Sequence, residues 1–209
     1  MRVALKVDPR LKIEEPWNQP AIPELVYLVG GLDEEKAACF RRDLEVAECN
    51  ANIAGQKILP ICIDSYGGGV YEMMSCLDAI DACEIDIATI VEGKAMSAGA
   101  IIFSCGKQGL RFMGPNATLM IHAASGGVEG NADIMRSEAD EITRLSTAAL
   151  KRLAINCKKP EKFFVDYIKS RGNAEIYLSA KQCKRLGITN HIKIPRLTVE
   201  ISATHTFEF

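Results

Sequence analysis

Three residues of this chain have types and an order that suit nucleophilic catalysis: Ser97, His122 and Glu175. Ser97 lies among small residues in Gly93-Lys94-Ala95-Met96-Ser97-Ala98-Gly99-Ala100, between two apolar runs. A serine nucleophile needs little bulk around its hydroxyl and backbone N–H groups that face a developing oxyanion. The order serine, histidine, acid differs from the three commonest triad orders, so it indicates a particular family rather than hydrolases in general.

A glycine turn is the fourth candidate element. The segment Asp64-Ser65-Tyr66-Gly67-Gly68-Gly69 leaves an expected strand and enters an expected helix. Consecutive glycines let the backbone approach a ligand and point N–H groups into a site. Each element is weak evidence alone, because glycine turns, packed serines, core histidines and solvated acids are all common. Their functional interpretation therefore depends on the fold that positions them.

Strand and helix patterns alternate along the chain. Apolar runs predict strands at 25–29, 57–64, 85–91, 110–113 and 118–123. Between and after them, helical patterns cover 33–50, 70–83, 97–105, 161–171 and 179–187. This rhythm predicts an α/β fold with a largely buried sheet.

The longest helical pattern runs from Ala132 to about Asn156. A stripe of apolar residues spaced by three and four follows one face: Met135, Ala139, Ile142, Leu145, Ala149 and Leu153. A helix of this length spans about 37 Å, longer than a domain of this size usually needs. Two interpretations stay open: a helix packed on its own core, or a projecting helix that packs on another subunit.

Both ends of the chain differ from the body. Residues 1–24 predict an extended arm, because they contain half of the prolines, and Trp17 is expected to anchor this arm on the body or on a neighbour. Residues 193–209 form an extension in which Leu197, Val199 and Ile201 alternate as in a strand.

Composition narrows the classes of function. The length of 209 residues fits one domain. The 25 basic and 27 acidic residues are nearly balanced, and the sequence has no basic block that would indicate binding to nucleic acid. The apolar runs are too short for a membrane span or a secretory signal. The eight cysteines contain no C-x-x-C pair and no Cys/His cluster. We therefore expect a cytoplasmic protein with reduced cysteines, no metal site, and no nucleic-acid or membrane partner.

Taken together, these motifs resemble the proteolytic subunits of the Clp proteases, the ClpP family, from about Leu25 to about Ile192. A Gly-Gly turn, a helix and a strand ending in Gly-x-Ala-x-Ser-x-Gly-Ala match Gly67 through Ala100. A Pro-Asn turn before a strand ending in Met-Ile-His matches residues 115–122, and the Gly-Gly pair follows at 126–127. The acid-x-aromatic-x-Ser-Ala motif matches residues 175–180.

The resemblance implies an α/β ClpP/crotonase-like fold, a repeated β-β-α spiral with a protruding handle. The peptidase domain would cover residues 25–192, and the handle, a strand plus the long helix, would cover about 124–157. The strand at Gly126, Gly127 and Val128 to Glu129 would pair with an extended substrate.

The resemblance also implies roles for the site residues. Ser97 would attack the peptide carbonyl, His122 would transfer its proton, and Glu175 would orient the imidazole. The N–H groups of Gly68 and Ala98 would form the oxyanion hole.

Assembly and partners follow from the same resemblance. Two stacked heptameric rings, a tetradecamer, would enclose a chamber in which unfolded polypeptides are degraded. An ATP-dependent unfoldase of the AAA+ class would feed it. The subunit itself would need no cofactor, because it has no P-loop motif and ATP would be used only by the unfoldase.

The chain departs from the family pattern at several positions. Glu175 stands where the family normally has Asp, with Asn173 as a weaker candidate, and Ala174 replaces an Arg. Tyr66 replaces the Pro of the glycine turn, Asp64 replaces an Asn, and Pro60 and Cys62 replace aromatic residues that line the docking pockets for the ATPase. These departures indicate a divergent member, such as a viral or accessory form.

Three alternatives to an active Ser-His-acid peptidase stay open. A catalytically silent ring subunit would keep the fold for assembly alone, but would be expected to lack Ser97 or His122. An acyl-CoA enzyme of the crotonase fold would need no serine. A Ser–Lys peptidase would use Lys94 as its base, although three residues before Ser97 is a poor position for that amine.

Overall fold

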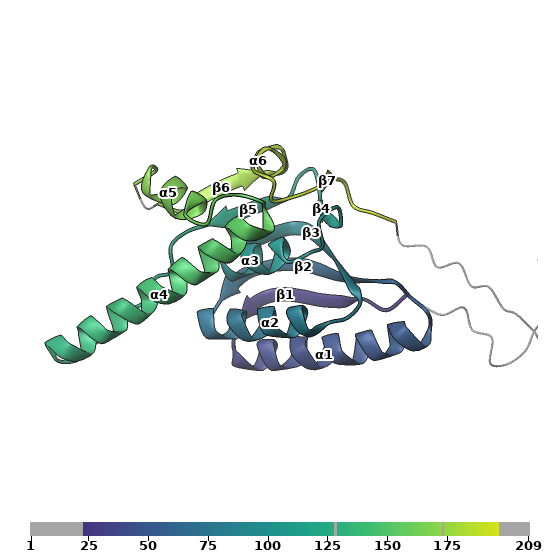
Figure 1. Cartoon of the computed structure of the whole chain (residues 1–209), viewed down its shortest axis with the longest axis horizontal. Helices are drawn as coiled ribbons and strands as arrows, with labels where there is room; N and C mark the ends of the chain where they lie inside the picture. Colours follow the sequence, from purple (N-terminus) through teal and green to yellow (C-terminus); the bar gives the residue numbers. More distant parts are fainter. Residues whose placement is uncertain (1–22, 128, 173, 197–209) are drawn as a thin grey trace, which may run out of the picture. The chain divides into compact units, whose positions relative to one another are not determined.

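Parallel strands form the centre of the computed structural model, which describes residues 23–127, 129–172 and 174–196 (Figure 1). The strands β1 (Val26–Leu32), β2 (Ile58–Gly68) and β3 (Asp86–Met96) pair in parallel in that order. Trp17, Val128, Asn173 and the expected strand near Leu197 lie outside the described residues.

The third strand has two different partners along its length. Its middle, Thr89–Val91, pairs in parallel with β4 (Arg111–Met113), and its last three residues pair in parallel with β5 (Thr118–Ile121). The sheet is completed by β7 (His191–Ile192) beside β4 and by β6 (Ile176–Ser179), which runs antiparallel to β5. The end of β3 is therefore the point where the sheet divides.

Three strands run further than their apolar patterns predict. The prediction ended them at residues 29, 64 and 91, whereas β1 continues to Leu32, β2 to Gly68 and β3 to Met96. These extra residues pair with neighbouring backbone, Gly68 with Leu32 and Met96 with Met120. Their ladder hydrogen bonds stabilise an extended backbone that the side-chain pattern does not signal. The expected turn at 65–69 is thus mostly strand.

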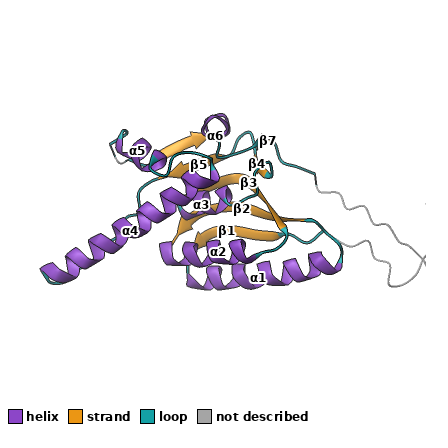
Figure 2. Cartoon of the chain, in the orientation of Figure 1, coloured by secondary structure: helices purple, strands orange, loops and turns teal. Residues whose placement is uncertain are grey.

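Helices cover the sheet and pack against one another (Figure 2). The helix α1 (Glu34–Ile53) begins after Asp33, whose carboxylate accepts the Lys36 N–H at 2.8 Å, as expected for an N-cap residue. The helix α2 (Val70–Ala82) begins at the second residue after β2 ends, and α1 packs beside it.

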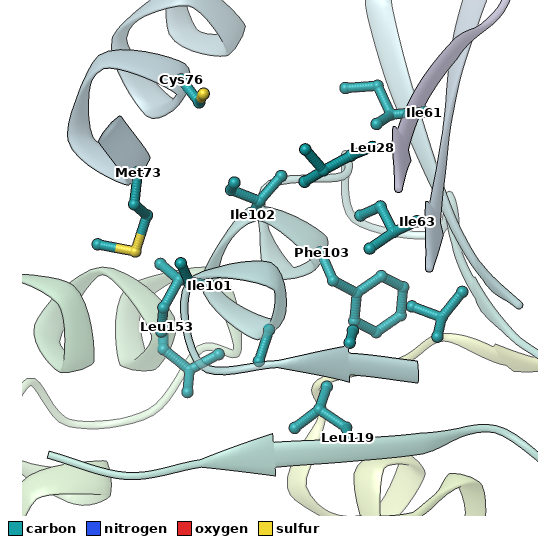
Figure 3. Packing of buried hydrophobic residues seen from close by; sticks show 14 of the residues in the cluster. Leu28, Ile61, Ile63, Met73, Cys76, Ile101, Ile102, Phe103, Leu119 and Leu153 are labelled. Atoms are coloured by element: carbon teal, nitrogen blue, oxygen red, sulfur yellow. The ribbon is translucent and has the colours of Figure 1, made fainter. Parts of the chain in front are cut away.

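The short helix α3 (Ala98–Ser104) is the centre of the core, since each of its residues is buried. Figure 3 shows Ile101, Ile102 and Phe103 of this helix among side chains from β1, β2, β5, α2 and α4. These surrounding side chains are Leu28, Ile61, Ile63, Leu119, Met73, Cys76 and Leu153. A helix held on all sides in this way gives a rigid support to the residue before it.

The long helix α4 (Ala132–Asn156) has the predicted bounds. Its second half packs on the core, where Leu145, Leu150 and Leu153 are buried. Its first half projects from the body (Figure 1), and every residue from 132 to 140 is exposed. The second half therefore matches the interpretation of a helix packed on its own core. The first half projects, as the other interpretation requires.

The last described elements cover the edge near β5. The helix α5 (Phe163–Lys169) is shorter than predicted, and α6 (Ala180–Leu186) begins at a capping box formed by Ser179 and Gln182. Gly187 ends α6 with a φ of 82°, which favours glycine.

The predicted strand at residues 126–129 is not formed in the described part of this segment, which excludes residue 128. Residues 122–127 have no regular secondary structure. A strand needs a neighbour for its N–H and C=O groups, and this segment pairs with no other described residue.

A buried arginine connects distant segments beside the core. Arg111 is 1% exposed, and its guanidinium donates hydrogen bonds to Asn156 O at 3.0 Å, Gln108 Oε1 at 2.6 Å and Asn190 Oδ1 at 3.2 Å. It therefore fixes the end of α4 and the approach to β7 against β4.

Candidate active site

Ser97 occupies a sharp turn between a strand and a helix. It follows the last residue of β3 and precedes the first residue of α3, with φ 53° and ψ −120°. A residue with a side chain rarely adopts this conformation, and such strain is characteristic of nucleophiles at strand-to-helix elbows. The turn is held because the Ser97 N–H donates to Met120 O at 2.8 Å and its carbonyl accepts the Ala100 N–H at 3.0 Å.

The glycine segment lies directly against this turn. A Cβ atom on Gly67 would lie 2.5 Å from Met96 O and 2.8 Å from Ser97 Cβ, so only glycine fits. A Cβ atom on Gly68 would collide with the Leu32 carbonyl. Ser65 fixes the segment, because its Oγ donates to Gly30 O at 2.7 Å and accepts the Gly67 N–H at 3.0 Å.

His122 lies beside Ser97 although 25 residues separate them. The pairing of β5 with the end of β3 brings the residue after β5 next to the residue after β3. The distance between His122 Nε2 and Ser97 Oγ is 2.8 Å, and the imidazole is half-buried. An imidazole at hydrogen-bond distance can take the hydroxyl proton as the oxygen attacks.

A cavity of about 110 Å³ opens at this pair. Ser97, His122, Gly68 and Ala98 all line it. Ala98 is the first residue of α3, so its N–H has no partner within the helix. The rest of the lining is mostly apolar and comprises Val70, Met73, Ile101, Ile121, Ala124, Ser125, Ser146, Ala149 and Leu150.

The sequence did not predict a role in the site for these lining residues, and it named Ala149 only as part of the apolar stripe on the long helix. Val70 and Met73 begin the helix after the glycine turn, and Ser146, Ala149 and Leu150 lie one helical turn apart on α4. Their spacing of three and four residues is a signal of a shared face, but it cannot distinguish a cavity wall from ordinary core.

The register of β5 and β6 leads to Glu175 and His122 as the next pair, but the Glu175 carboxylate has another partner. The antiparallel ladder of β5 and β6 ends at the pair Ile121 and Ile176, and the next residues along are His122 and Glu175. Glu175 is exposed, and its Oε2 accepts a hydrogen bond of 2.8 Å from the Tyr177 hydroxyl. This bond raises the pKa of Tyr177. No hydrogen bond links Glu175 to His122 within the described residues.

The segment after His122 runs along α4. The Ala124 N–H donates to Ser146 Oγ at 3.0 Å. Gly126 and Gly127 are exposed, and a Cβ atom on Gly126 would lie 2.8 Å from Ile142 Cδ1. The third residue expected to bind substrate, Val128, lies outside the described residues.

Lys94 has a partner other than Ser97. Its Nζ lies 2.7 Å from Asp64 Oδ1 and 4.1 Å from the centre of the Tyr66 ring. The hydrogen bond to Asp64 raises the pKa of Lys94, which keeps the amine protonated. A protonated amine directed at a carboxylate is a poor general base, so the geometry disfavours the Ser–Lys alternative.

All eight cysteines are free, and Cys76, Cys157 and Cys183 are buried. Within residues 23–196, apart from 128 and 173, no group of three or more His, Cys, Asp or Glu side chains is arranged to bind a metal ion. Over the same residues, no helix combines the length and apolarity that crossing a membrane requires.

Comparison with known families gives one match that covers most of the chain. The family model of the Clp proteases matches residues 22–196. This range contains the glycine segment, the strained Ser97 turn, His122 and α4. The observed sheet of parallel strands with covering helices agrees with the ClpP-like fold expected from the motifs. The chain therefore belongs to the Clp protease family.

Proposed function

We propose that the protein is a serine endopeptidase of the ClpP type that cleaves unfolded polypeptides. The observation that carries the proposal is the 2.8 Å contact between Ser97 Oγ and His122 Nε2 at the mouth of a cavity. The strained backbone of Ser97 supports it, because such strain is retained where the surrounding structure presents a nucleophile.

The reaction would proceed in two steps. Ser97 Oγ attacks the peptide carbonyl carbon while His122 Nε2 takes the hydroxyl proton, and His122 then gives that proton to the leaving amine. Water, deprotonated by His122, hydrolyses the resulting acyl-enzyme, and the proton returns to Ser97. This chemistry needs no metal or cofactor.

Two backbone N–H groups would stabilise the tetrahedral intermediate. Gly68 and Ala98 line the cavity beside Ser97 and are the proposed oxyanion donors. Removing one such donor typically costs about 3 kcal/mol of transition-state stabilisation. The apolar part of the cavity would bind the side chain of the residue before the scissile bond, and the segment with Gly126, Gly127 and Val128 would bind the extended substrate backbone.

Glu175 is the proposed third member. Residues directly opposite in an antiparallel pair have side chains on the same face, about 5 Å apart at Cβ. Extension of the β5–β6 register by one pair would place Glu175 opposite His122. Rotation of its carboxylate from Tyr177 to His122 Nδ1 would complete the triad.

The assembly proposal rests on the free half of α4. Ile134 is 48% exposed and Met135 is 45% exposed, in a helix segment whose residues 132–140 are all exposed among the residues that the structure describes. Apolar residues on a projecting helix fit a contact with another subunit. We propose heptameric rings stacked as a tetradecamer in the cytoplasm, fed by an AAA+ unfoldase that alone uses ATP.

A fluorophosphonate probe tests the catalytic proposal. We expect the assembled protein to be labelled at Ser97, as located by mass spectrometry, and to hydrolyse fluorogenic peptides. Ser97→Ala should remove both signals, and His122→Ala should slow labelling at least 100-fold. An unlabelled Ser97 in the assembled wild type would contradict the proposal, and a monomer in light scattering under all conditions would contradict the chamber.

One observation favours the second candidate, a catalytically silent ring subunit. The Glu175 carboxylate binds Tyr177 rather than His122. A silent subunit would assemble into rings of normal size yet show neither labelling nor hydrolysis. The same two measurements therefore separate the two candidates.

A further inference from the structure

Two polar contacts connect α2 to α4. Near the beginning of α2, the Tyr71 hydroxyl donates a hydrogen bond of 3.0 Å to Glu141 Oε1. Near its end, Arg152 Nη1 donates to Asp81 Oδ2 at 2.8 Å, and Nη2 contacts the other carboxylate oxygen. The contacts join residues 70 and 71 positions apart in the chain, so the two helices run in the same direction with matched spacing.

The cavity beside Ser97 lies between these contacts. Two residues of α2 line it: Met73 lies between Tyr71 and Asp81 in the helix, and Val70 is the residue directly before Tyr71. On α4, the lining residues Ser146, Ala149 and Leu150 all lie between Glu141 and Arg152. The two contacts therefore bracket opposite walls of the cavity.

The floor between these walls is the buried helix α3. It contacts both α2 and α4, and Ile101 lines the cavity. Met73, Ile101 and Leu153 belong to one core cluster (Figure 3). Since α3 is fixed in the core, movement of α2 relative to α4 would mainly change the width of the cavity.

An ion pair with Arg144 orients the carboxylate in the contact between Tyr71 and Glu141. Arg144 donates two hydrogen bonds of 2.7 Å to the two carboxylate oxygens of Glu141. This bidentate pair and the Tyr71 hydroxyl lower the pKa of Glu141 to about 2. Glu141 is therefore an ionised acceptor in one orientation, which suits it to hold the Tyr71 hydroxyl.

We infer that Tyr71–Glu141 and Asp81–Arg152, here named the α2–α4 ties, determine how large a side chain the cavity accepts before the scissile bond. The inference rests on the proposed peptidase function. Partly exposed polar contacts contribute little to overall stability. Their effect is geometric, because a cavity of about 110 Å³ changes greatly in relative size when one wall moves slightly.

Peptides that differ only in the residue before the scissile bond test the specificity role. The variants are Tyr71→Phe, Asp81→Asn and their combination, which remove the tie groups with little change in side-chain volume. In the combined variant we expect the ratio of kcat/KM for Phe over Ala peptides to rise about tenfold, mainly through KM, since pocket fit of this kind is worth about 10- to 200-fold. Labelling of Ser97 by a small fluorophosphonate should stay within about threefold of wild type.

The matched control is Asp86→Asn. It removes an exposed ion pair with Lys107, at 2.6 Å, and neither residue lines the cavity. This variant should leave the Phe-to-Ala ratio unchanged. An equal change in the control would overturn the inference.

Hydrogen exchange of backbone amides supplies a readout that does not depend on catalysis. We expect exchange at residues 145–150 to accelerate about tenfold in the combined variant. Faster exchange with an unchanged Phe-to-Ala ratio would show that the ties do not determine specificity. Unchanged exchange would show that the ties do not hold α2 and α4 in place. A wild type without labelling or hydrolysis contradicts the proposed function instead, and exchange then decides on the ties alone.

Discussion

The Tyr177 hydroxyl donates a hydrogen bond of 2.8 Å to the Glu175 carboxylate, beside an imidazole that the same carboxylate is proposed to orient. The two side chains are both exposed and lie two residues apart. Tyr177 is therefore the observed partner of the acid that is proposed to orient His122. Of the proposed triad, Glu175 is therefore the member whose side-chain orientation depends most on a neighbouring side chain.

Removing the competing hydroxyl should favour the triad. We expect Tyr177→Phe to raise kcat about two- to fivefold, because loss of one hydrogen bond of about 1 kcal/mol frees the carboxylate. Glu175→Gln should lower kcat at least 10-fold, since a neutral amide stabilises the imidazolium poorly. Peptide hydrolysis measured across pH checks both. Wild-type rates in both variants would show that Glu175 does not orient His122.

The close approach of Gly67 to Ser97 gives a second prediction. Gly67→Ala should lower kcat/KM at least 100-fold while the protein remains folded, because the added methyl group displaces Ser97 from its elbow. Circular dichroism with peptide hydrolysis checks this outcome. Gly31→Ala is the matched control, since its Cβ would meet nothing closer than 4.0 Å. Equal activity of the two variants would contradict the prediction.

Lys94 should be dispensable for the chemical step. Its ammonium is bound by Asp64 and lies over Tyr66, so Lys94→Met should keep kcat within about threefold of wild type. Stopped-flow acylation of Ser97 measures the step directly. A 100-fold loss with normal assembly would instead support the Ser–Lys mechanism.

Buried thiols predict a loss of stability at alkaline pH. Burial raises the pKa of Cys157 to about 11 and of Cys183 to about 12, from 9.0. In the unfolded chain these thiols ionise first, so their contribution is complete below pH 9 and is lost as pH rises toward 11 to 12. Urea unfolding between pH 8 and 11 should show a shallower decline for Cys183→Ala than for wild type.

The exposed Cys49 provides the control for this experiment. Cys49→Ala should leave the pH dependence of the unfolding free energy unchanged. Identical pH dependence in wild type and Cys183→Ala would show that the buried thiol does not contribute.

The buried guanidinium of Arg111 should matter for folding. Arg111→Lys should lower the free energy of unfolding by about 2–4 kcal/mol, because an ammonium cannot satisfy the same fork of acceptors in Asn156, Gln108 and Asn190. Urea denaturation measures the change. Arg136→Lys, on the exposed half of α4, should stay within about 0.5 kcal/mol of wild type.

The sequence was sufficient for most elements and for singling out Ser97 and His122, which the structure brings to within 2.8 Å of each other. Alternating apolar runs and helical stripes predicted the order of elements, since they report directly which faces are buried. The small residues around Ser97 predicted the turn. They did not predict its positive φ, which depends on Met120 and Gly67, two contacts distant in the chain.

Other features depend on tertiary contacts that no local pattern carries. The strand β6 was not foreseen, because its four residues have too short an alternation to signal one. The contact between Glu175 and Tyr177 depends on side-chain rotation, which a family motif does not specify. The walls of the cavity could not be predicted, because they depend on how α2 and α4 are placed relative to each other.

The division of β3 between two partners has a consequence for how the protein fails on heating. Ser97 and His122 are aligned through a ladder of only three residue pairs, Lys94–Met96 with Thr118–Met120. A short ladder can open locally at a lower free energy than the whole domain. Warming would then separate Ser97, the proposed nucleophile, from His122, the proposed base, while the main sheet remains intact. Thermal inactivation would therefore precede melting.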